Sequence, residues 1–274
     1  AFIVYSVMVP AATVPALFAA GLFPGIVAAA CLLVPAILIS RKHGFGRDYK
    51  AERPPLGRTF IDAIWGLMAP VIILGGLRTG LFTPTEAAVI AVAYGIFVGM
   101  VVYRTIGLKD LFRILIDAGE LAAVVLMIIG IASVFAWAGN TLGIFDAAAA
   151  TLVGLHSSEW LMLLSINLLL LVAGMFLDAI SVFLILLPLL VPIALAMEWD
   201  LVWFGVMMTI NLAIGQFTPP MAISLMITSR MAGIGMEETF RWVVWLVLAM
   251  GAGLTLMIVF PQLALWLPGR LGYL

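Results

Sequence analysis

The sequence predicts an all-α integral membrane protein that crosses the bilayer several times, and three observations lead to this fold class. Of its 274 residues, 65% are hydrophobic and 10% are charged, against about 45–50% and about 25% in a soluble domain. Several apolar runs are long enough for a helix to cross a hydrocarbon core of ~30 Å. Other apolar runs are about half as long and are broken by glycine and proline, which indicates discontinuous helices at membrane depth.

Full-length spans are expected at residues 18–40, 60–77, 85–103, 121–138 and 240–266. Residues 41–58 hold six lysines and arginines and a Pro-Pro pair, and they form the clearest loop outside the membrane. In residues 104–118 the apolar and charged side chains fall on opposite helical faces. This pattern predicts an interfacial helix that lies in the headgroup plane and does not span.

The half-length runs gather in residues 140–236. Runs at 160–173 and 180–196 flank a glycine-led link, which predicts a re-entrant hairpin at about 160–196. Runs at 204–214 and 221–227 flank the segment GQFTPP, which predicts a broken helix at about 201–230. A single long helix kinked at proline is the alternative for this segment.

Charge distribution supports the hairpin. If the loop 41–58 is cytoplasmic and the hairpin returns to its own side, eleven of the thirteen basic residues lie in the cytoplasm. Counting the hairpin as one crossing would move Arg230 and Arg241 outside, against the positive-inside rule.

Residues 1–35 and 222–259 share a plan, in which an apolar half-piece and a small-residue link precede a full span. The topology makes the two spans run in opposite directions, as in an inverted repeat. The predicted divisions are therefore the end of a first repeat at 1–40, the loop 41–58, scaffold helices at 59–139, a second-repeat transport region at 140–236, and a last transmembrane helix at 237–274.

Composition excludes several classes of activity. A net charge of −1 offers no basic surface for nucleic acid. Cys31 is the only cysteine and lies in an apolar run, so disulfides and cysteine-ligated metal are excluded. His43 and His156 are expected in loops, and the sequence has no HExxH or GxSxG motif. An enzyme is therefore not predicted.

The candidate site lies at the two breaks. Asp178 follows the glycine turn of the hairpin, and two roles stay open: it shapes an ion or substrate site, or it caps the following helix. In the broken helix, Gly215 and the prolines free backbone carbonyls. Sodium prefers several oxygen ligands without full charge, and carbonyls at the break could supply them; a structural kink is the alternative. The candidate ligands and neighbours for sodium or substrate are Gly174, Met175, Asp178, Asn211, Gly215, Phe217, Thr218 and Pro219.

A second motif is expected to be structural. Thr83 is placed to cap a helix, Pro84 and Thr85 open it, and Glu86 lies in its first turn, where the helix dipole favours an acid. A well-formed helix start explains the motif without a role in transport.

Four motifs in order resemble the large membrane subunit of TRAP transporters, which belong to the ion transporter superfamily. They are LFAAGLFPG at 17–25, GLFTPTEAA at 80–88, GMFLD at 174–178 with PLLVPI at 188–193, and NLAIGQFTPP at 211–220.

This resemblance implies a sodium-driven, elevator-type importer of small organic acids, such as C4-dicarboxylates, other carboxylates or sialic acid. It also implies a bacterial inner-membrane location, a small membrane subunit and a periplasmic substrate-binding protein as partners, and no cofactor besides sodium as coupling ion. The resemblance places sodium sites where a hairpin tip meets a broken helix, here residues 174–178 against 215–219.

Members of this family carry an earlier half with its own hairpin, so we expect the chain to be the C-terminal part of a longer carrier that does not transport alone. Two other functions stay open. One is a carrier of the same superfamily that works without a binding protein, for dicarboxylates or other anions. The other is a membrane scaffold or assembly factor that transports nothing.

Overall fold

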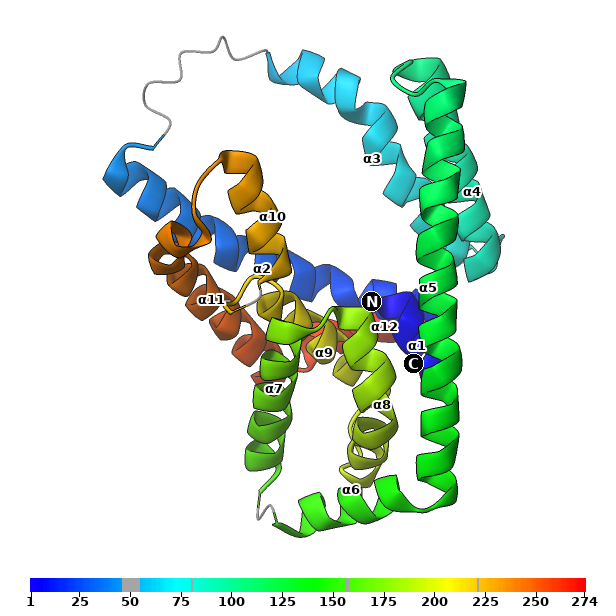
Figure 1. Cartoon of the computed structure of the whole chain (residues 1–274), viewed down its shortest axis with the longest axis vertical. Coiled ribbons are helices and arrows are strands. Elements are labelled where there is room, and N and C mark those ends of the chain that lie inside the picture. The colour runs from blue at the N-terminus through cyan, green and yellow to red at the C-terminus, as the bar shows by residue number, and fades with distance from the viewer. Residues whose placement is uncertain (46–54, 80, 156–157, 221) are drawn as a thin grey trace. The chain divides into compact units, whose positions relative to one another are not determined.

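The computed structural model is built of helices and describes residues 1–45, 55–79, 81–155, 158–220 and 222–274 (Figure 1). In this part of the chain, seven helices are long and apolar enough to cross a membrane, and no strand occurs. The all-α, multi-spanning fold class is therefore confirmed. The helices in chain order are α1 (Phe2–Met8), α2 (Val14–His43), α3 (Leu56–Arg78), α4 (Pro84–Phe97), the π-helix η1 (Val98–Val102), α5 (Leu108–Thr141), α6 (Ile144–Leu155), α7 (Glu159–Phe176), α8 (Ala179–Ala196), α9 (Leu201–Gly215), α10 (Ile223–Ala232), α11 (Met236–Val259) and α12 (Gln262–Leu271).

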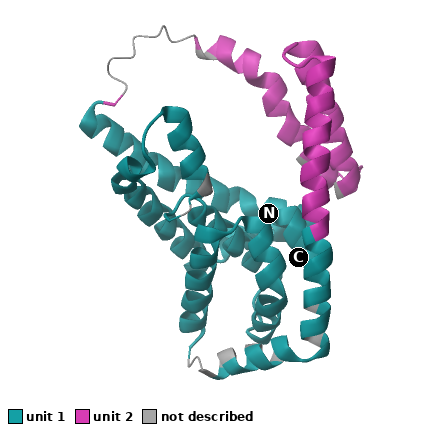
Figure 2. Ribbon diagram, viewed as in Figure 1, with its two compact units in different colours: residues 1–44, 128–274 teal, residues 45–127 magenta. Residues whose placement is uncertain are grey.

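Two compact units make up the chain, residues 45–127 and residues 1–44 with 128–274 (Figure 2). In the first unit α3 packs against α4. Two tyrosine hydroxyls join these elements, because Tyr94 donates to the carbonyl of Trp65 and Tyr103 to that of Asp62, each at 2.6 Å. The pairing runs in opposite directions along the chain, so α3 and α4 are antiparallel.

The start of α4 is a complete capping box. The Thr83 hydroxyl accepts from the backbone N–H of Glu86 at 3.3 Å, and the Glu86 carboxylate accepts from the backbone N–H of Thr83 at 2.8 Å. Pro84 is the first helical residue, where its missing N–H costs nothing, and Thr85 follows it. This is the helix start that the sequence predicts at residues 83–86.

In the second unit α2 and α11 are antiparallel neighbours. His43 at the end of α2 packs edge-on against Trp242 near the start of α11, with ring centroids 4.7 Å apart. Farther along, a Cβ on Gly253 of α11 would lie 3.1 Å from the sulfur of Cys31. The opposite directions of α2 and α11 are those expected for the two spans of the inverted repeat. His43 is thus part of a helix end and not of a loop, and His156 lies outside the described residues.

The hydrophobic core of this unit is centred on α9. Most of its residues are buried, and Phe204, Met207 and Met208 are fully so. Helices α2, α7, α8, α11 and α12 all pack against α9. A helix that is apolar all round belongs in the interior of a bundle, because no face of it needs water.

Residues 104–118 do not form a helix of their own. The structure runs α5 without a break from Leu108 to Thr141, so the boundary predicted between an interfacial helix and a span at 121–138 is wrong. No proline lies between these segments, and a lone glycine, Gly119, costs a helix only about 1 kcal/mol. The backbone hydrogen bonds therefore continue through the change of composition.

The structure differs from the predicted helices at two further places, which lie near segments rich in small residues or proline. The span predicted at 240–266 is broken, because α11 ends at Val259 and α12 begins at Gln262. Phe260 has φ −120° and ψ 77°, so it has left the helical region, which is disfavoured for a residue that precedes a proline. Helix α6 was not predicted, although its run of four alanines favours a helix. Half of the loop predicted at 41–58, residues 46–54, lies outside the described residues.

Candidate functional site

The candidate site is built on three consecutive helices, α7, α8 and α9. Helix α8 returns antiparallel to α7 after a two-residue link, and α9 then runs parallel to α7 (Figure 1). The parallel register follows from contacts between α7 and the α9 segment, which advance together along both elements. Consequently α9 begins at the base of the hairpin and ends level with its tip.

A side-chain hydrogen bond joins the two ends of the hairpin at its base. The indole N–H of Trp199 donates to the carboxylate of Glu159 at 2.7 Å. Trp199 is buried and packs edge-on against Trp203 of α9, with ring centroids 6.2 Å apart. Asp200 then caps α9 by accepting from the N–H groups of Val202 and Trp203.

Midway along the helices, two asparagines join α7 to α9. The Nδ2 of Asn211 donates to the backbone carbonyl of Asn167 at 2.9 Å and to its Oδ1 at 2.8 Å. Asn167 in turn donates to the carbonyl of Leu163, one turn earlier in its own helix. Because Asn211 faces two acceptors, its orientation is fixed, and its Oδ1 is buried without a hydrogen-bond partner. The structure therefore leaves one neutral acceptor buried a single turn before the break in α9.

At the tip, the backbones of α7 and α9 touch. A Cβ on Gly215 would lie 2.6 Å from the carbonyl carbon of Gly174 and 2.8 Å from its Cα. Both glycines are buried. A side chain at position 215 would prevent this approach, so the glycine at the end of α9 allows the two predicted breaks to come into direct contact.

Asp178 is the N-cap of α8. Its carboxylate accepts from the N–H groups of Ile180 and Ser181, at 2.9 and 3.2 Å, and from the hydroxyl of Ser181. The side chain is exposed, and Met175 before it is half-buried. The capping role left open by the sequence is thus present in the structure. A carboxylate whose acceptors are filled in this way orients the hairpin link.

Helix α9 ends at Gly215 and α10 begins at Ile223, and residues 216–220 and 222 of the break between them are described. The carbonyl of Gly215 accepts from the N–H of Thr218 at 3.0 Å, and that of Gln216 accepts from the N–H of Ser224 at 3.2 Å. The Thr218 hydroxyl donates to the carbonyl of Ile214 at 2.6 Å, which leaves its oxygen lone pairs as acceptors. The ring of Phe217 packs on the core, and Pro219 is half-buried with no N–H to donate.

The site therefore offers neutral oxygens rather than charges. In the described part of the chain, no group of three or more His, Cys, Asp or Glu side chains could hold a metal ion. Hydroxyl and amide oxygens and backbone carbonyls suit a hard, singly charged cation, and the buried Asn211 oxygen is an acceptor still to be satisfied. The chemistry of the residues present fits sodium.

Sequence reasoning missed two contributors to this arrangement. Asn167 is, with Ser165, one of two uncharged polar residues in the leucine-rich helix α7, and Glu159 lies at the start of the same helix. An uncharged polar residue within an apolar membrane helix indicates a partner on another helix. That signal was present at Asn167, but the partner could be identified only once the register of α7 and α9 was known.

Comparison with known proteins places the fold in a family. Residues 1–263 match the family model of the tripartite ATP-independent periplasmic transporter, DctM component. The chain is 39% identical over 263 residues to the sialic acid TRAP transporter large permease protein SiaM of Vibrio cholerae, covering 95% of this chain and 61% of that protein. It is 36% identical to the C4-dicarboxylate TRAP transporter large permease protein DctM of Rhodobacter capsulatus, covering 96% and 60%.

A third relative, the sialic acid TRAP transporter permease protein SiaT of Haemophilus influenzae, is 35% identical over 274 residues, covering 99% of this chain and 44% of that protein. The chain thus spans about half the length of the curated relatives it matches. The shared part includes both breaks described above.

Proposed function

Because this chain belongs to the DctM component family of the tripartite ATP-independent periplasmic transporters, we propose that it acts in sodium-coupled uptake of small organic acids. The family is one of transporters and not of enzymes, and the chain is a multi-pass membrane protein. The observation that supports a transport site is the contact of Gly174 with Gly215, where a hairpin tip meets a helix break. Such breaks supply free backbone groups to substrates and ions at membrane depth.

Sodium would be bound near the break by Thr218, by carbonyls of residues 215–219 and by the oxygen of Asn211. Asp178 would orient the hairpin link that covers the site. Helices α7, α8 and α9 would move as one body together with α2, α11 and α12, which pack against α9, and this is the elevator mechanism. Within this body, contacts at the base, the middle and the tip of the hairpin join α7 to the α9 segment.

The substrate is proposed to be a small organic acid, because relatives are named for sialic acid and C4-dicarboxylates. The proposed partners are a small membrane subunit and a periplasmic substrate-binding protein, as the word tripartite in the family description suggests. We place the protein in the bacterial inner membrane with the loop 41–58 in the cytoplasm, where its basic residues satisfy the positive-inside rule.

The test is uptake into proteoliposomes that contain the full-length protein and its membrane partner, with the binding protein added outside. Labelled succinate and sialic acid serve as substrates, and potassium replaces sodium in the matched sample. We expect uptake only with an inward sodium gradient and only with the binding protein. Equal uptake in potassium would refute the coupling, and uptake without the binding protein would favour a carrier that works alone.

The variant Thr218→Val tests the site itself. Losing one polar contact at a buried site costs about 1–3 kcal/mol, so the sodium concentration for half-maximal uptake should rise roughly tenfold. Thr228→Val is the matched control, because the Thr228 hydroxyl only bonds carbonyls within exposed turns of α10. Equal sodium dependence in the two variants would remove Thr218 from the ion site.

A further inference from the structure

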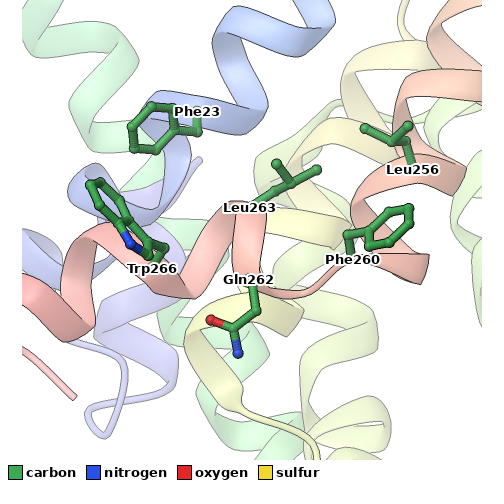
Figure 3. Close-up of a pocket in the computed structure, with 6 residues that line it drawn as sticks. All are labelled: Phe23, Leu256, Phe260, Gln262, Leu263 and Trp266. Atoms are coloured by element: carbon green, nitrogen blue, oxygen red, sulfur yellow. The ribbon is translucent and has the colours of Figure 1, made fainter.

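An apolar groove opens where the last membrane span breaks. It has a volume of about 610 Å³ and is lined by residues of α2, α11, α12 and the link between the last two (Figure 3). Its lining residues are Phe23, Leu256, Phe260, Gln262, Leu263 and Trp266. The groove exists because α11 ends before Pro261 and α12 continues in another direction. The side of α11 next to this turn is therefore left uncovered. Its volume is in the range of ligand-binding cavities.

The lining favours a flexible acyl chain over a protein helix. Helices associate in membranes through small residues that let their backbones approach closely. Three of the six residues here are large aromatics, and none is small. Phe23 and Trp266 pack edge-on with ring centroids 5.4 Å apart, so the wall at this end is formed by side chains that stand away from the backbone. A chain of methylene groups can follow such a surface, whereas a second helix cannot pack closely on it.

Helix α12 gives this groove a polar end. At ten residues it is about 15 Å long and cannot cross a bilayer alone. Ala264 and Pro268 are buried on one face, while Gln262, Trp266 and Arg270 are exposed at helical spacing on another. A tryptophan with a basic residue one turn away is typical of the level of lipid headgroups, where the ring is partly apolar and the charge reaches water.

The positive charge of Arg270 lies at the Trp266 end of the groove. The guanidinium carbon of Arg270 is 5.9 Å from the centroid of the Trp266 ring. An acyl chain in the groove would therefore have its headgroup beside a cation, and none of the six described lining residues is acidic. This complementarity selects a lipid whose phosphate carries an uncompensated negative charge.

We propose that the groove between α2, α11 and α12 binds an anionic phospholipid, with one acyl chain against Phe23, Leu256 and Leu263 and the phosphate at Arg270. The site is distinct from the ion site, because none of its residues belongs to α7, α8 or α9. It does not depend on the proposed transport function.

Lipid titration of the delipidated full-length protein in detergent tests the proposal. Dioleoyl phosphatidylglycerol and dioleoyl phosphatidylcholine share their acyl chains, so their relative affinities report the headgroup alone. We expect phosphatidylglycerol to bind about fivefold more tightly, as measured by thermal shift and native mass spectrometry. Arg270→Gln should remove this preference and Arg270→Lys should keep it.

The matched control is Arg241→Gln. Arg241 also lies over a tryptophan ring, with its guanidinium carbon 4.4 Å from the centroid of Trp242. It lies near the start of α11, whereas the groove is at the end of that helix, and it is not among the lining residues. Its variant should keep the preference. A preference that survives in Arg270→Gln, or that is absent from the unaltered protein, would overturn the proposal.

A photo-crosslinking residue at position 263 identifies the occupant in native membranes. A crosslink to phospholipid, detected by mass spectrometry of the modified peptide, supports the proposal. A crosslink to a polypeptide alone would assign the groove to a partner helix instead.

Discussion

The contact between Gly174 and Gly215 predicts different effects for two similar substitutions, Gly215→Ala and Gly174→Ala. Gly215→Ala adds a methyl group that would lie 2.6 Å from the carbonyl carbon of Gly174 and 3.0 Å from its oxygen. These neighbours are backbone atoms of a packed helix, so they cannot rotate away. Gly174→Ala adds the same methyl group to the other helix, where its nearest neighbour is the end of the Leu212 side chain at 3.3 Å.

The size of the effect follows from these distances. Ordinary contacts of a Cβ begin near 3.4 Å, so α9 and the end of α7 would have to separate by roughly 0.8 Å in Gly215→Ala. Overpacking of this kind costs about 1–3 kcal/mol. A displacement near 1 Å at a functional site can lower a rate by about 10²-fold. Gly174→Ala needs a shift of only about a tenth of an ångström at its closest contact, so its cost should stay below about 1 kcal/mol.

Both variants are made in the full-length protein and compared by unfolding in detergent and by sodium-dependent uptake in proteoliposomes. Gly215→Ala should lose stability and most of its uptake, while Gly174→Ala should resemble the unaltered protein. Gly251→Ala in α11 is the control for adding a methyl group to a span, because nothing lies within 4 Å of its Cβ position. If Gly215→Ala and Gly174→Ala behave alike, the backbone contact does not determine the site.

Two further predictions concern hydrogen bonds, one inside each of the two compact units. Asn167→Leu and Asn211→Leu should each destabilise the protein. Their double-mutant cycle, measured by unfolding, should show a coupling of about 0.6 kcal/mol and at most about 1.7 kcal/mol, the average and maximum for hydrogen bonds between membrane helices. Additive losses would contradict the pairing. Thr83→Val should weaken the start of α4 by about 1 kcal/mol, while Thr83→Ser should not. Hydrogen exchange at Glu86 should then be about fivefold faster in the valine variant alone, with uptake unchanged in both; equal protection in the two variants would exclude a capping role for Thr83.

The parts of the fold that could be predicted are those in which local chemistry decides the outcome. The interruption after Gly215 follows from a glycine and two prolines within six residues, and the cap at Thr83 follows from a threonine, a proline and a glutamate at fixed spacing. Apolar length alone locates most of the spans.

The predictions are wrong or incomplete where the structure depends on several residues acting together. Residues 104–118 are amphipathic, but nothing in them ends a helix, so α5 continues where composition changes. Pro261 lies inside the span predicted at 240–266. Its effect depends on whether the following residues have a surface to pack on, and α2 provides one for α12. The partnership of Asn167 with Asn211 needed the register of two helices separated by a third, which no local pattern contains.

That partnership also sets an order of events while the chain is being made. The two asparagines are 44 residues apart, so at about 5–20 residues per second α7 enters the membrane several seconds before its partner exists. During this interval Asn167 already has an acceptor in its own helix, because its Nδ2 donates a hydrogen bond to the carbonyl of Leu163 at 2.8 Å, which does not require α9. Asn211 differs, because in the folded chain both hydrogen bonds of its Nδ2 go to Asn167. The amide of the earlier helix therefore has an acceptor before α9 is made, whereas the amide of the later helix is bonded across the interface.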